Sequence, residues 1–243
     1  MLLSLNTCGS TASVALGVVA ADEIQIVATA TLAVRTYSAR LIPEIAAMLE
    51  SRRATLCDIE AIVVVNGPGS FTGVRVGLST AKGLAEGAGI PLIAVSRLAL
   101  LAAASGLSHV VAAVDAGRGE YYVGEYREGN KLGEVLLSGD ETMAAAKQPG
   151  AGVLVCDESR AGDLPPDVRE AATSVCSALA ICGPVYVQPP DAADALHFAL
   201  DRFRAHAFDD VESLQANYLR RSDAEVLRSV RAAVPAGSKV NAT

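Results

Sequence analysis

The chain has 243 residues, of which 51% are hydrophobic and 19% are charged. This composition excludes an intrinsically disordered chain and predicts a sizeable buried core. The formal net charge is −7, so we do not expect the chain by itself to bind RNA or DNA tightly, because that binding needs a positive field. The five cysteines are an odd number without a C-x-x-C pair, which favours reduced thiols over a disulfide framework or a metal site.

The N-terminal part of the chain alternates between strand and helix patterns. Apolar runs with period-2 alternation predict strands, and apolar residues at helical spacing predict the helices between them. The predicted strands are residues 2–6, 12–20, 23–34, 61–65 and 91–95. The predicted helices are residues 38–52, 73–88 and 96–105. Ser70 or Thr72 is expected to cap the second of these helices, and Gly87 and Gly89 are expected to end it.

The same pattern restarts near Gly106. A strand is predicted to end on Asp115, and two further strands form a predicted hairpin around Gly129-Asn130. The predicted strands and shorter apolar segments of this part are residues 109–115, 120–128, 131–138, 143–148, 152–156 and 177–182. The last predicted element is a helix at residues 191–205.

The repeated order predicts two related halves rather than one doubly wound sheet. We predict an α/β chain with duplicated βββαβα halves, the second of them reduced. The first lobe is expected at residues 1–105 and the second at residues 106–222. Residues 223–243 are expected to form a polar, disordered tail.

Neither the N-terminus nor the longest apolar stretch indicates a membrane protein. The first basic residue is Arg35, and polar residues interrupt the apolar start, which argues against a signal peptide. Arg97 breaks the apolar stretch at residues 90–107, which is too short to span a bilayer. We therefore expect a soluble, cytoplasmic protein that contacts no membrane.

The segment NGPGSFTGVRVG at residues 66–77 follows a predicted strand and opens a helix, as phosphate-binding loops do. A P-loop starting at Gly69 needs a second glycine where this chain has Val74, and the first lysine after the turn is Lys82. A dinucleotide fingerprint needs glycine at position 72, which is Thr72. The segment therefore lacks the residues on which both kinds of phosphate loop depend.

The helix after this turn carries small residues on one stripe. Glycine inside a helix costs about 1 kcal/mol relative to alanine, so several glycines need a compensating contact. A stripe without side chains allows another backbone to approach closely, either inside the subunit or across a subunit interface. The residues on this stripe include Gly73, Gly77, Thr80 and Leu84.

The stretch NGPGSFTGVRVGLSTAKGLA resembles the signature of the TsaB family, also called YeaZ. The segments YSARLIPEIAAMLE, VDAGRGEYYVGEY and NYLRR also resemble segments of this family. The resemblance implies the two-lobed fold of the actin, hexokinase and Hsp70 group (the ASKHA fold). It also implies an activating subunit of the bacterial machinery that makes threonylcarbamoyladenosine at position 37 of certain tRNAs.

The resemblance implies partners as well. They are a catalytic TsaD-like paralogue and a TsaE-like ATPase, with a homodimer when the chain is alone and tRNA contacted only through the complex. We predict that Gly73, Gly77, Thr80 and Leu84 present a flat stripe to a partner helix. Arg75 and Lys82 lie seven residues apart on the same helix, where a solvated face and ion pairs with the partner are both open interpretations.

The ASKHA fold has two phosphate motifs, and this chain keeps their outline only in part. The first corresponds to Asn6, Thr7 and Gly9, and the second to Asp115 and Gly117. The alternative for Asp115, which we favour, is that it caps the turn at Arg118-Gly119. Family members usually carry aspartate at the position of Asn6, and an amide does not attract a magnesium-bound water as a carboxylate does. We expect no cofactor in the isolated chain, and ATP or ADP only at the interface with the catalytic partner.

We expect no metal site and no catalytic residues of the chain's own. Its three histidines, His109, His197 and His206, form neither an H-x-x-x-H nor an H-E-x-x-H motif. A stand-alone kinase or ATPase of the same fold is the alternative function, and it would need acidic magnesium ligands. A peptidase is a further alternative, and it would need a nucleophile beside a histidine base.

Overall fold

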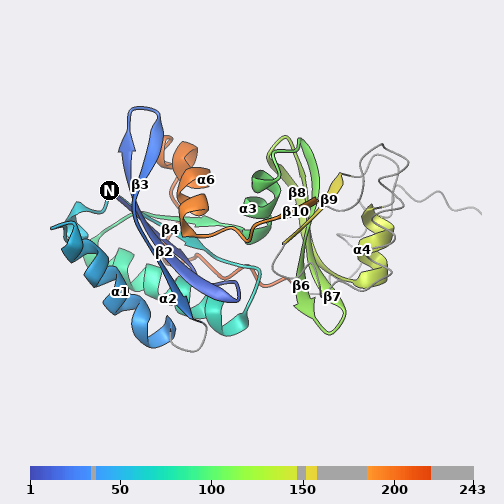
Figure 1. The fold of residues 1–243 in the computed structure, drawn as a ribbon, viewed down its shortest axis with the longest axis horizontal. Helices are drawn as coiled ribbons and strands as arrows, with labels where there is room; N and C mark the ends of the chain where they lie inside the picture. Colours follow the sequence, from blue (N-terminus) through green and yellow to red (C-terminus); the bar gives the residue numbers. More distant parts are fainter. Residues whose placement is uncertain (34–36, 147–151, 158–184, 220–243) are drawn as a thin grey trace, which may run out of the picture.

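The computed structural model describes residues 1–33, 37–146, 152–157 and 185–219 (Figure 1). Within this part of the chain, two mixed five-stranded sheets stand side by side, each covered by helices. The fold class is therefore α/β, as the sequence predicts. The predicted segment at residues 177–182 and the predicted tail at residues 223–243 lie outside the described residues.

The first sheet has the order β3-β2-β1-β4-β5. Strands β1, β2 and β3 are antiparallel neighbours, while β1, β4 and β5 run parallel. All residues of β1 and β4 are buried, as expected for central strands covered on both faces. The strands are β1 (Leu2–Asn6), β2 (Thr11–Ala20), β3 (Glu23–Ala33), β4 (Ala61–Val65) and β5 (Leu92–Val95).

Helices cover the two faces of the first sheet. The helices α1 (Tyr37–Ser51) and α2 (Phe71–Ala88) share one hydrophobic cluster with alternate residues of the strands, such as Leu3 and Leu5. Side chains of a strand alternate between the two faces of its sheet. Leu2 and the helix α6 (Ala192–Arg204) belong to the cluster on the opposite face. A short 3-10 helix, η1 (Leu56–Asp58), precedes β4.

The second sheet has the order β10-β9-β6-β7-β8 and the same pattern of strand directions as the first. In this pattern β6 takes the place of β1, and β9 takes the place of β4. The helix α4 (Gly139–Ala146) packs on one face and α3 (Arg97–Ala104) on the other. The strands are β6 (His109–Gly117), β7 (Glu120–Arg127), β8 (Asn130–Ser138), β9 (Val153–Asp157) and β10 (Val185–Val187).

The helices α3 and α6 pack across the lobe boundary that the sequence suggests. The helix α3 follows the first sheet in the chain but packs on β6, β7 and β9. The helix α6 follows the second sheet but packs on all five strands of the first. The two helices also contact each other, in the middle of Figure 1. A boundary at residues 105 and 106 stays a prediction, but the packing does not follow it.

The helix ends follow local side-chain chemistry. The helix α2 begins at Phe71, two residues earlier than predicted, because the Ser70 side chain accepts a hydrogen bond from the Gly73 amide. Gly89 ends it in the left-handed conformation, as the sequence suggests. Within the described residues, no helix combines the length and the apolar character needed to cross a membrane.

Residues 206–219 form a segment that we call the C-terminal strap. It leaves α6 and runs along the first sheet to the glycine-rich turn. The amide of Asp209 donates to the Leu92 carbonyl of β5, and the amide of Asn217 donates to the Asn66 carbonyl at the end of β4. The ammonium of Lys82 donates to two carbonyls of the strap between these points. The strap therefore places the last described residues beside the start of α2.

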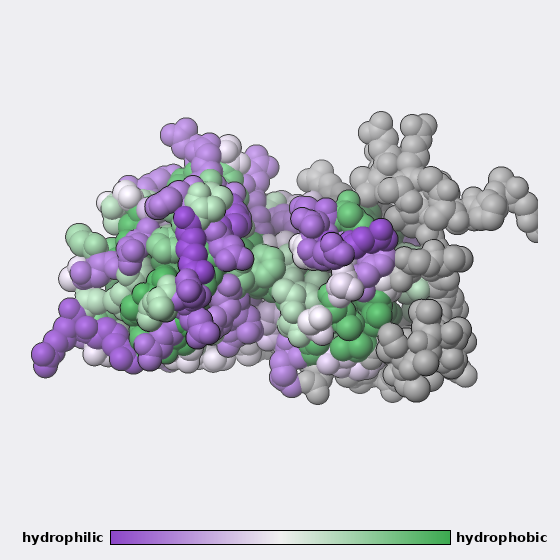
Figure 2. All heavy atoms as spheres, turned by 90° about the horizontal axis from the view of Figure 1, so that it is seen from above, coloured by the Kyte–Doolittle hydropathy of each residue, from purple (hydrophilic) through white to green (hydrophobic). Residues whose placement is uncertain are grey.

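Hydrophilic residues cover much of the face seen in Figure 2, and hydrophobic residues show between them where the two halves meet. The meeting region is bounded by the loop after β1, the start of α2 and the end of β6. It contains the candidate site.

Candidate functional site

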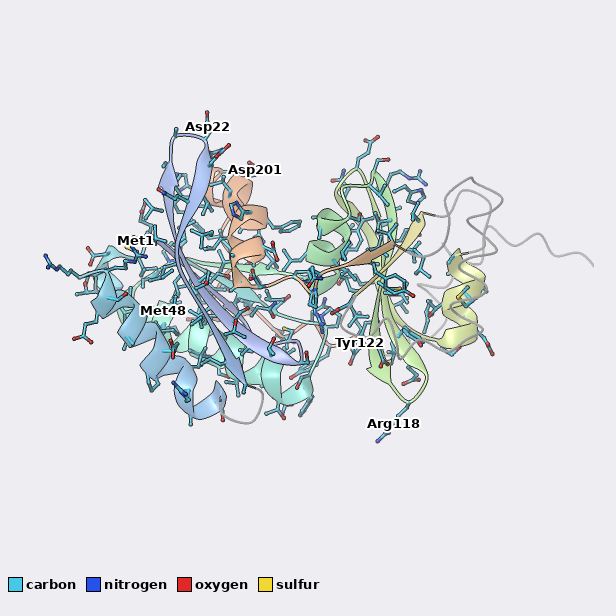
Figure 3. All side chains as sticks on the ribbon, in the orientation of Figure 1. Met1, Asp22, Met48, Arg118, Tyr122 and Asp201 are labelled. Atoms are coloured by element: carbon cyan, nitrogen blue, oxygen red, sulfur yellow. The ribbon has the colours of Figure 1, made fainter. Side chains whose placement is uncertain are left out.

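A cleft with a volume of about 600 Å³ opens between the two halves. Residues 8–10 and 69–71 line it from the first half, and residues 114–117 line it from the end of β6. Tyr122 of β7 lies in the middle of Figure 3 and adds an aromatic wall. Loops that follow the ends of sheet strands thus meet here, as they do at many ligand sites of α/β proteins.

A buried ion pair at this cleft is joined to the first half through the Cys8 carbonyl. The Arg97 guanidinium lies 2.8 Å from the Asp157 carboxylate, measured from Nη2 to Oδ2, and both residues are more than 90% buried, at 8% and 7% exposure. The second guanidinium nitrogen, Nη1, donates to the Cys8 carbonyl at 3.3 Å. The sequence shows Arg97 only as a break in an apolar stretch. Its role depends on Asp157, which is distant in the chain, so sequence analysis missed this pair.

The first predicted phosphate motif is used for contacts within the chain. The Asn6 amide nitrogen donates to the Pro190 carbonyl at 2.8 Å, and its amide oxygen accepts from the Cys8 amide. The Thr7 hydroxyl donates to the Gly73 carbonyl at 2.6 Å. Of the predicted set in this loop, only Gly9 lines the cleft. Asn6 and Thr7 hold the loop in place and do not face the cleft.

The second predicted phosphate motif does line the cleft, with Asp115 and Gly117. The Asp115 carboxylate accepts a hydrogen bond from the Gly117 amide at 2.6 Å, which starts the turn between β6 and β7. This is the local capping role that the sequence favours for Asp115. Arg118 stands at the tip of that turn and points away from the rest of the molecule (Figure 3).

Two thiols near the cleft are buried. Cys8 lines the cleft, and its thiol donates to the Val65 carbonyl. Burial raises the pKa of the Cys8 thiol to about 12. Burial, together with the neighbouring Asp157 charge, raises the pKa of the Cys156 thiol to about 12 as well. Both stay protonated at neutral pH, and the thiolate is the reactive form.

The glycine-rich turn packs directly on the loop after β1. A side chain at Gly69 would place its Cβ 2.3 Å from the Cys8 carbonyl oxygen, so only glycine fits here. The next amide, of Ser70, donates to that same carbonyl at 3.0 Å. The turn is therefore a close contact between two backbones and aims α2 across the sheet, which explains the glycines without a bound phosphate.

The structure corrects the expectation that Gly73 and Gly77 present a stripe to a partner helix. Both are buried inside the chain. A Cβ at Gly77 would lie 2.2 Å from the Thr7 hydroxyl oxygen, and that hydroxyl binds the Gly73 carbonyl. These glycines let α2 approach β1, which is the internal alternative that their spacing left open.

The other members of the predicted interface are placed differently. Thr80 and Leu84 are half-buried, and Leu84 packs against the core cluster beneath α2. Lys82 donates to the Glu212 and Leu214 carbonyls, so its ammonium holds the C-terminal strap. Of the predicted interface residues, only Arg75 is exposed. Partner contacts by these residues stay a prediction.

Arg75 contacts two neighbouring exposed aromatic side chains. Its guanidinium carbon is 3.7 Å from the centre of the Phe71 ring and 5.8 Å from that of the Tyr218 ring. Its Nε donates to the Tyr218 hydroxyl at 2.7 Å. Tyr218 belongs to the NYLRR segment, whose last two residues lie outside the described residues. The strap thus brings this segment onto the glycine helix.

A second polar contact joins the strap to the second sheet. The Glu134 side chain in β8 is 3% exposed and accepts hydrogen bonds from the hydroxyls of Ser96 and Tyr126. Its other oxygen accepts from the Asn217 amide nitrogen at 2.7 Å. Burial, together with the Glu134 charge, raises the pKa of the Tyr126 hydroxyl. Glu134 therefore links α3, β7 and the strap.

The histidines do not meet at the cleft. None of the three is among the residues that line it. His109 pairs with Glu125, with 2.9 Å between Nε2 and Oε1, at the far end of β6. Within the described part of the chain, no group of three or more histidine, cysteine or acidic residues has an arrangement that would hold a metal ion.

Comparison with known proteins places these observations in context. Residues 25–163 match the family model described as TsaD, tRNA N6-adenosine threonylcarbamoyltransferase. The chain is 37% identical over 150 residues to the tRNA threonylcarbamoyladenosine biosynthesis protein TsaB of Escherichia coli (strain K12), covering 60% of this chain and 62% of that protein. It is 35% identical over 148 residues to the protein of the same name from Bacillus subtilis (strain 168), covering 59% of this chain and 62% of that protein.

Among solved structures, YeaZ from Pseudomonas aeruginosa superposes with a TM-score of 0.67 at 25% sequence identity. The superposition covers 90% of this chain and 99% of that one. The aligned sequence spans less than two thirds of the length of the Escherichia coli and Bacillus subtilis proteins.

Proposed function

Because the chain belongs to the TsaB (YeaZ) family, we propose that it is a non-catalytic activating subunit in the synthesis of threonylcarbamoyladenosine in tRNA. Its catalytic partner is a TsaD-like paralogue, and a TsaE-like ATPase joins the two. Two relatives named as biosynthesis proteins for this nucleoside support the pathway, and the matching family model is that of the transferase. The chain contacts tRNA only through the complex, in the cytoplasm.

The observation that carries this proposal is the state of Asn6. Its amide makes two hydrogen bonds within the chain, to Pro190 and Cys8, where a nucleotide-binding relative would need an acidic group for magnesium. The chain has the two-sheet framework and its cleft. Asn6, however, bonds its own loop and Pro190, which lies just before α6. A scaffold role is compatible with this framework and with an amide, instead of a carboxylate, at position 6.

The proposal also includes the type of fold, the nucleotide and the state of the chain when alone. The equal strand order of the two sheets supports a duplicated unit and an ASKHA-type fold. The isolated chain holds no nucleotide of its own, and ATP or ADP binds where the chain meets its catalytic partner. When alone, the chain forms a homodimer. The exposed face of α2, on which Gly83 has open space above it, is available for such contacts.

The test is reconstitution with purified proteins. The chain, the TsaD-like paralogue and the TsaE-like ATPase of the same genome are combined with the threonylcarbamoyl donor and tRNA, and the modified nucleoside is measured by mass spectrometry. We expect modification only when the chain and the paralogue are both present. We also expect the isolated chain to hydrolyse no ATP and to modify no tRNA.

Two results would overturn the proposal. One is a paralogue with full activity in the absence of this chain. The other is ATP turnover by the isolated chain that is lost in the variant Asp115→Ala, which would support the alternative of a stand-alone kinase or ATPase.

A further inference from the structure

The last two described residues, Tyr218 and Leu219, lie beside the cleft between the two halves. The Tyr218 ring contacts the Phe71 ring, with 5.6 Å between their centres, and Phe71 lines the cleft from the first half. Leu219 packs against the hydrophobic cluster of the second half that contains Val114 and on which Tyr122 also packs, and both of those residues line the cleft. The end of the C-terminal strap therefore contacts both sides of the cleft, and the rest of the chain begins there.

Hydrogen bonds to both halves hold this end of the strap in place. The Asn217 backbone amide donates to the Asn66 carbonyl at 2.8 Å, and the Asn217 side chain donates to the buried Glu134 carboxylate at 2.7 Å. A group that is tethered close to its binding site has an effective concentration in the millimolar range. An interaction with a dissociation constant in that same range is then formed in about half of the molecules.

The cleft is suited to a cationic group. Among its described lining residues, the charged side chains are the carboxylates of Asp115 and Asp157 and the guanidinium of Arg97. That guanidinium is used inside the chain, because it bonds Asp157 and a backbone carbonyl. The Asp115 carboxylate accepts the Gly117 amide through one oxygen, and a carboxylate has about four acceptor sites in all. An aromatic ring such as that of Tyr122, which also lines the cleft, attracts a cation to its face.

The segment after Leu219 supplies cationic groups at this place. Residues 220–243 contain five basic and two acidic residues, in a chain whose net charge is −7. The first two of the basic residues are Arg220 and Arg221, so no linker separates them from the strap. Arginine has a planar guanidinium that forms paired hydrogen bonds with a carboxylate and stacks on aromatic rings. The cleft offers both kinds of group.

We propose that the chain's own basic segment occupies this cleft, with a guanidinium of Arg220 or Arg221 against the Asp115 carboxylate. The segment acts as an intramolecular ligand that keeps an external molecule out of the cleft. A basic peptide from a partner is disfavoured, because it would lose translational and rotational freedom on binding, whereas the tethered arginines do not. The inference does not depend on the proposed function, because it concerns contacts within one chain.

The test compares hydrogen exchange in the full parent chain with that in two doubly substituted chains. Arg220→Gln/Arg221→Gln removes the proposed ligand, and Arg228→Gln/Arg231→Gln is the matched control, with the same loss of charge in the same segment. We expect exchange at the amides of residues 8–10 and 114–117 to accelerate on the order of tenfold in the first variant and to keep the parent's rate in the second. High salt should accelerate the same amides in the parent, because it screens the ion pair.

A second measurement identifies the contact itself. Arg220→Lys and Arg221→Lys each introduce an ammonium group, which a carbodiimide joins to an adjacent carboxylate as an amide while the reagent takes up the water that is lost. Mass spectrometry of peptides from the monomer should find the new lysine of at least one variant linked to Asp115. Adding Asp115→Asn should abolish this link. Thermal unfolding of each variant confirms that it is folded.

Four results would overturn the inference. The first is unchanged exchange at the cleft amides in Arg220→Gln/Arg221→Gln, and the second is equal acceleration in both double variants, which would indicate a general effect of charge. The third is the absence of a link to Asp115 from both lysine variants. The fourth is a link found only in cross-linked dimers, which would place the segment of one chain in the cleft of another.

Discussion

At the scale of single residues, Gly77 and Gly83 of α2 differ in whether a side chain would fit at their position. The space where a Gly77 side chain would stand is filled by the Thr7 hydroxyl, at 2.2 Å from an added Cβ. Gly83 lies six residues later and is exposed, and apart from its own stretch of helix no atom lies within 4 Å of an added Cβ. Both glycines weaken the helix equally through backbone entropy. Their surroundings therefore decide at which position the fold requires glycine.

We predict opposite effects for alanine at these two positions. Gly77→Ala should lower the free energy of unfolding by about 2 kcal/mol, because the new methyl group displaces Thr7 from its hydrogen bond with Gly73. Gly83→Ala should raise the same free energy by about 0.5–1 kcal/mol, since it only removes the cost of glycine in a helix. Urea denaturation of the two variants beside the parent measures both. Equal free energies of unfolding for the two variants would show that α2 does not pack closely against Thr7.

At the scale of elements, the C-terminal strap holds parts of the molecule that are distant in sequence. It lies along the first sheet, and at its end Asn217 bonds both the glycine-rich turn and Glu134 of the second sheet. The Glu134 carboxylate also accepts hydrogen bonds from the Ser96 and Tyr126 hydroxyls, so this one acceptor group is surrounded by donors. A buried network of this kind is stable only while each member keeps its partner.

The variant Asn217→Asp tests the strap, because it places a second carboxylate against Glu134. Loss of the hydrogen bond and repulsion between like charges should cost about 2 kcal/mol and release the strap from the second sheet. Hydrogen exchange should then accelerate at the strap amides, while the amides of β1 and β4 keep their protection.

The double variant Asn217→Asp/Glu134→Gln reverses donor and acceptor and should restore most of the protection. If it exchanges as fast as the single variant, the bond between these two side chains does not hold the strap.

At the scale of the whole molecule, charge limits what the chain does alone. The net charge is −7, and the cleft contains two carboxylates, Asp115 and Asp157, beside the single guanidinium of Arg97. Binding of a nucleic acid backbone depends on positive groups that release counterions. A chain with this balance of charges supplies few such groups.

We therefore expect the isolated chain to bind tRNA with a dissociation constant no tighter than the micromolar range at physiological salt. Fluorescence anisotropy with labelled tRNA, repeated at several salt concentrations, measures this, and the complex with the paralogue is the positive control. A sub-micromolar constant for the isolated chain, falling steeply with added salt, would contradict the expectation.

The sequence by itself determined the family and most of the order of strands and helices, but it did not predict η1 at Leu56–Asp58 or β10 at Val185–Val187. Period-2 and helical patterns depend on neighbouring residues, which is why strands such as β1 and β4 and the ends of α2 at Ser70 and Gly89 agree with the structure within a few residues. The resemblance to the family is carried mainly by the stretch that begins at Asn66, whose residues are consecutive in the chain. The local cap made by Asp115 was predictable for the same reason.

Only the tertiary structure decided which residues meet across the chain. It packed α3 and α6 across the expected lobe boundary, paired Arg97 with Asp157, and set Tyr218 on Phe71 and Arg75. It also settled the two alternatives for Gly73 and Gly77 in favour of internal packing against Thr7. Spacing along a helix says which residues share a face, but what covers that face depends on contacts between distant segments, and a single sequence carries no local signal for them.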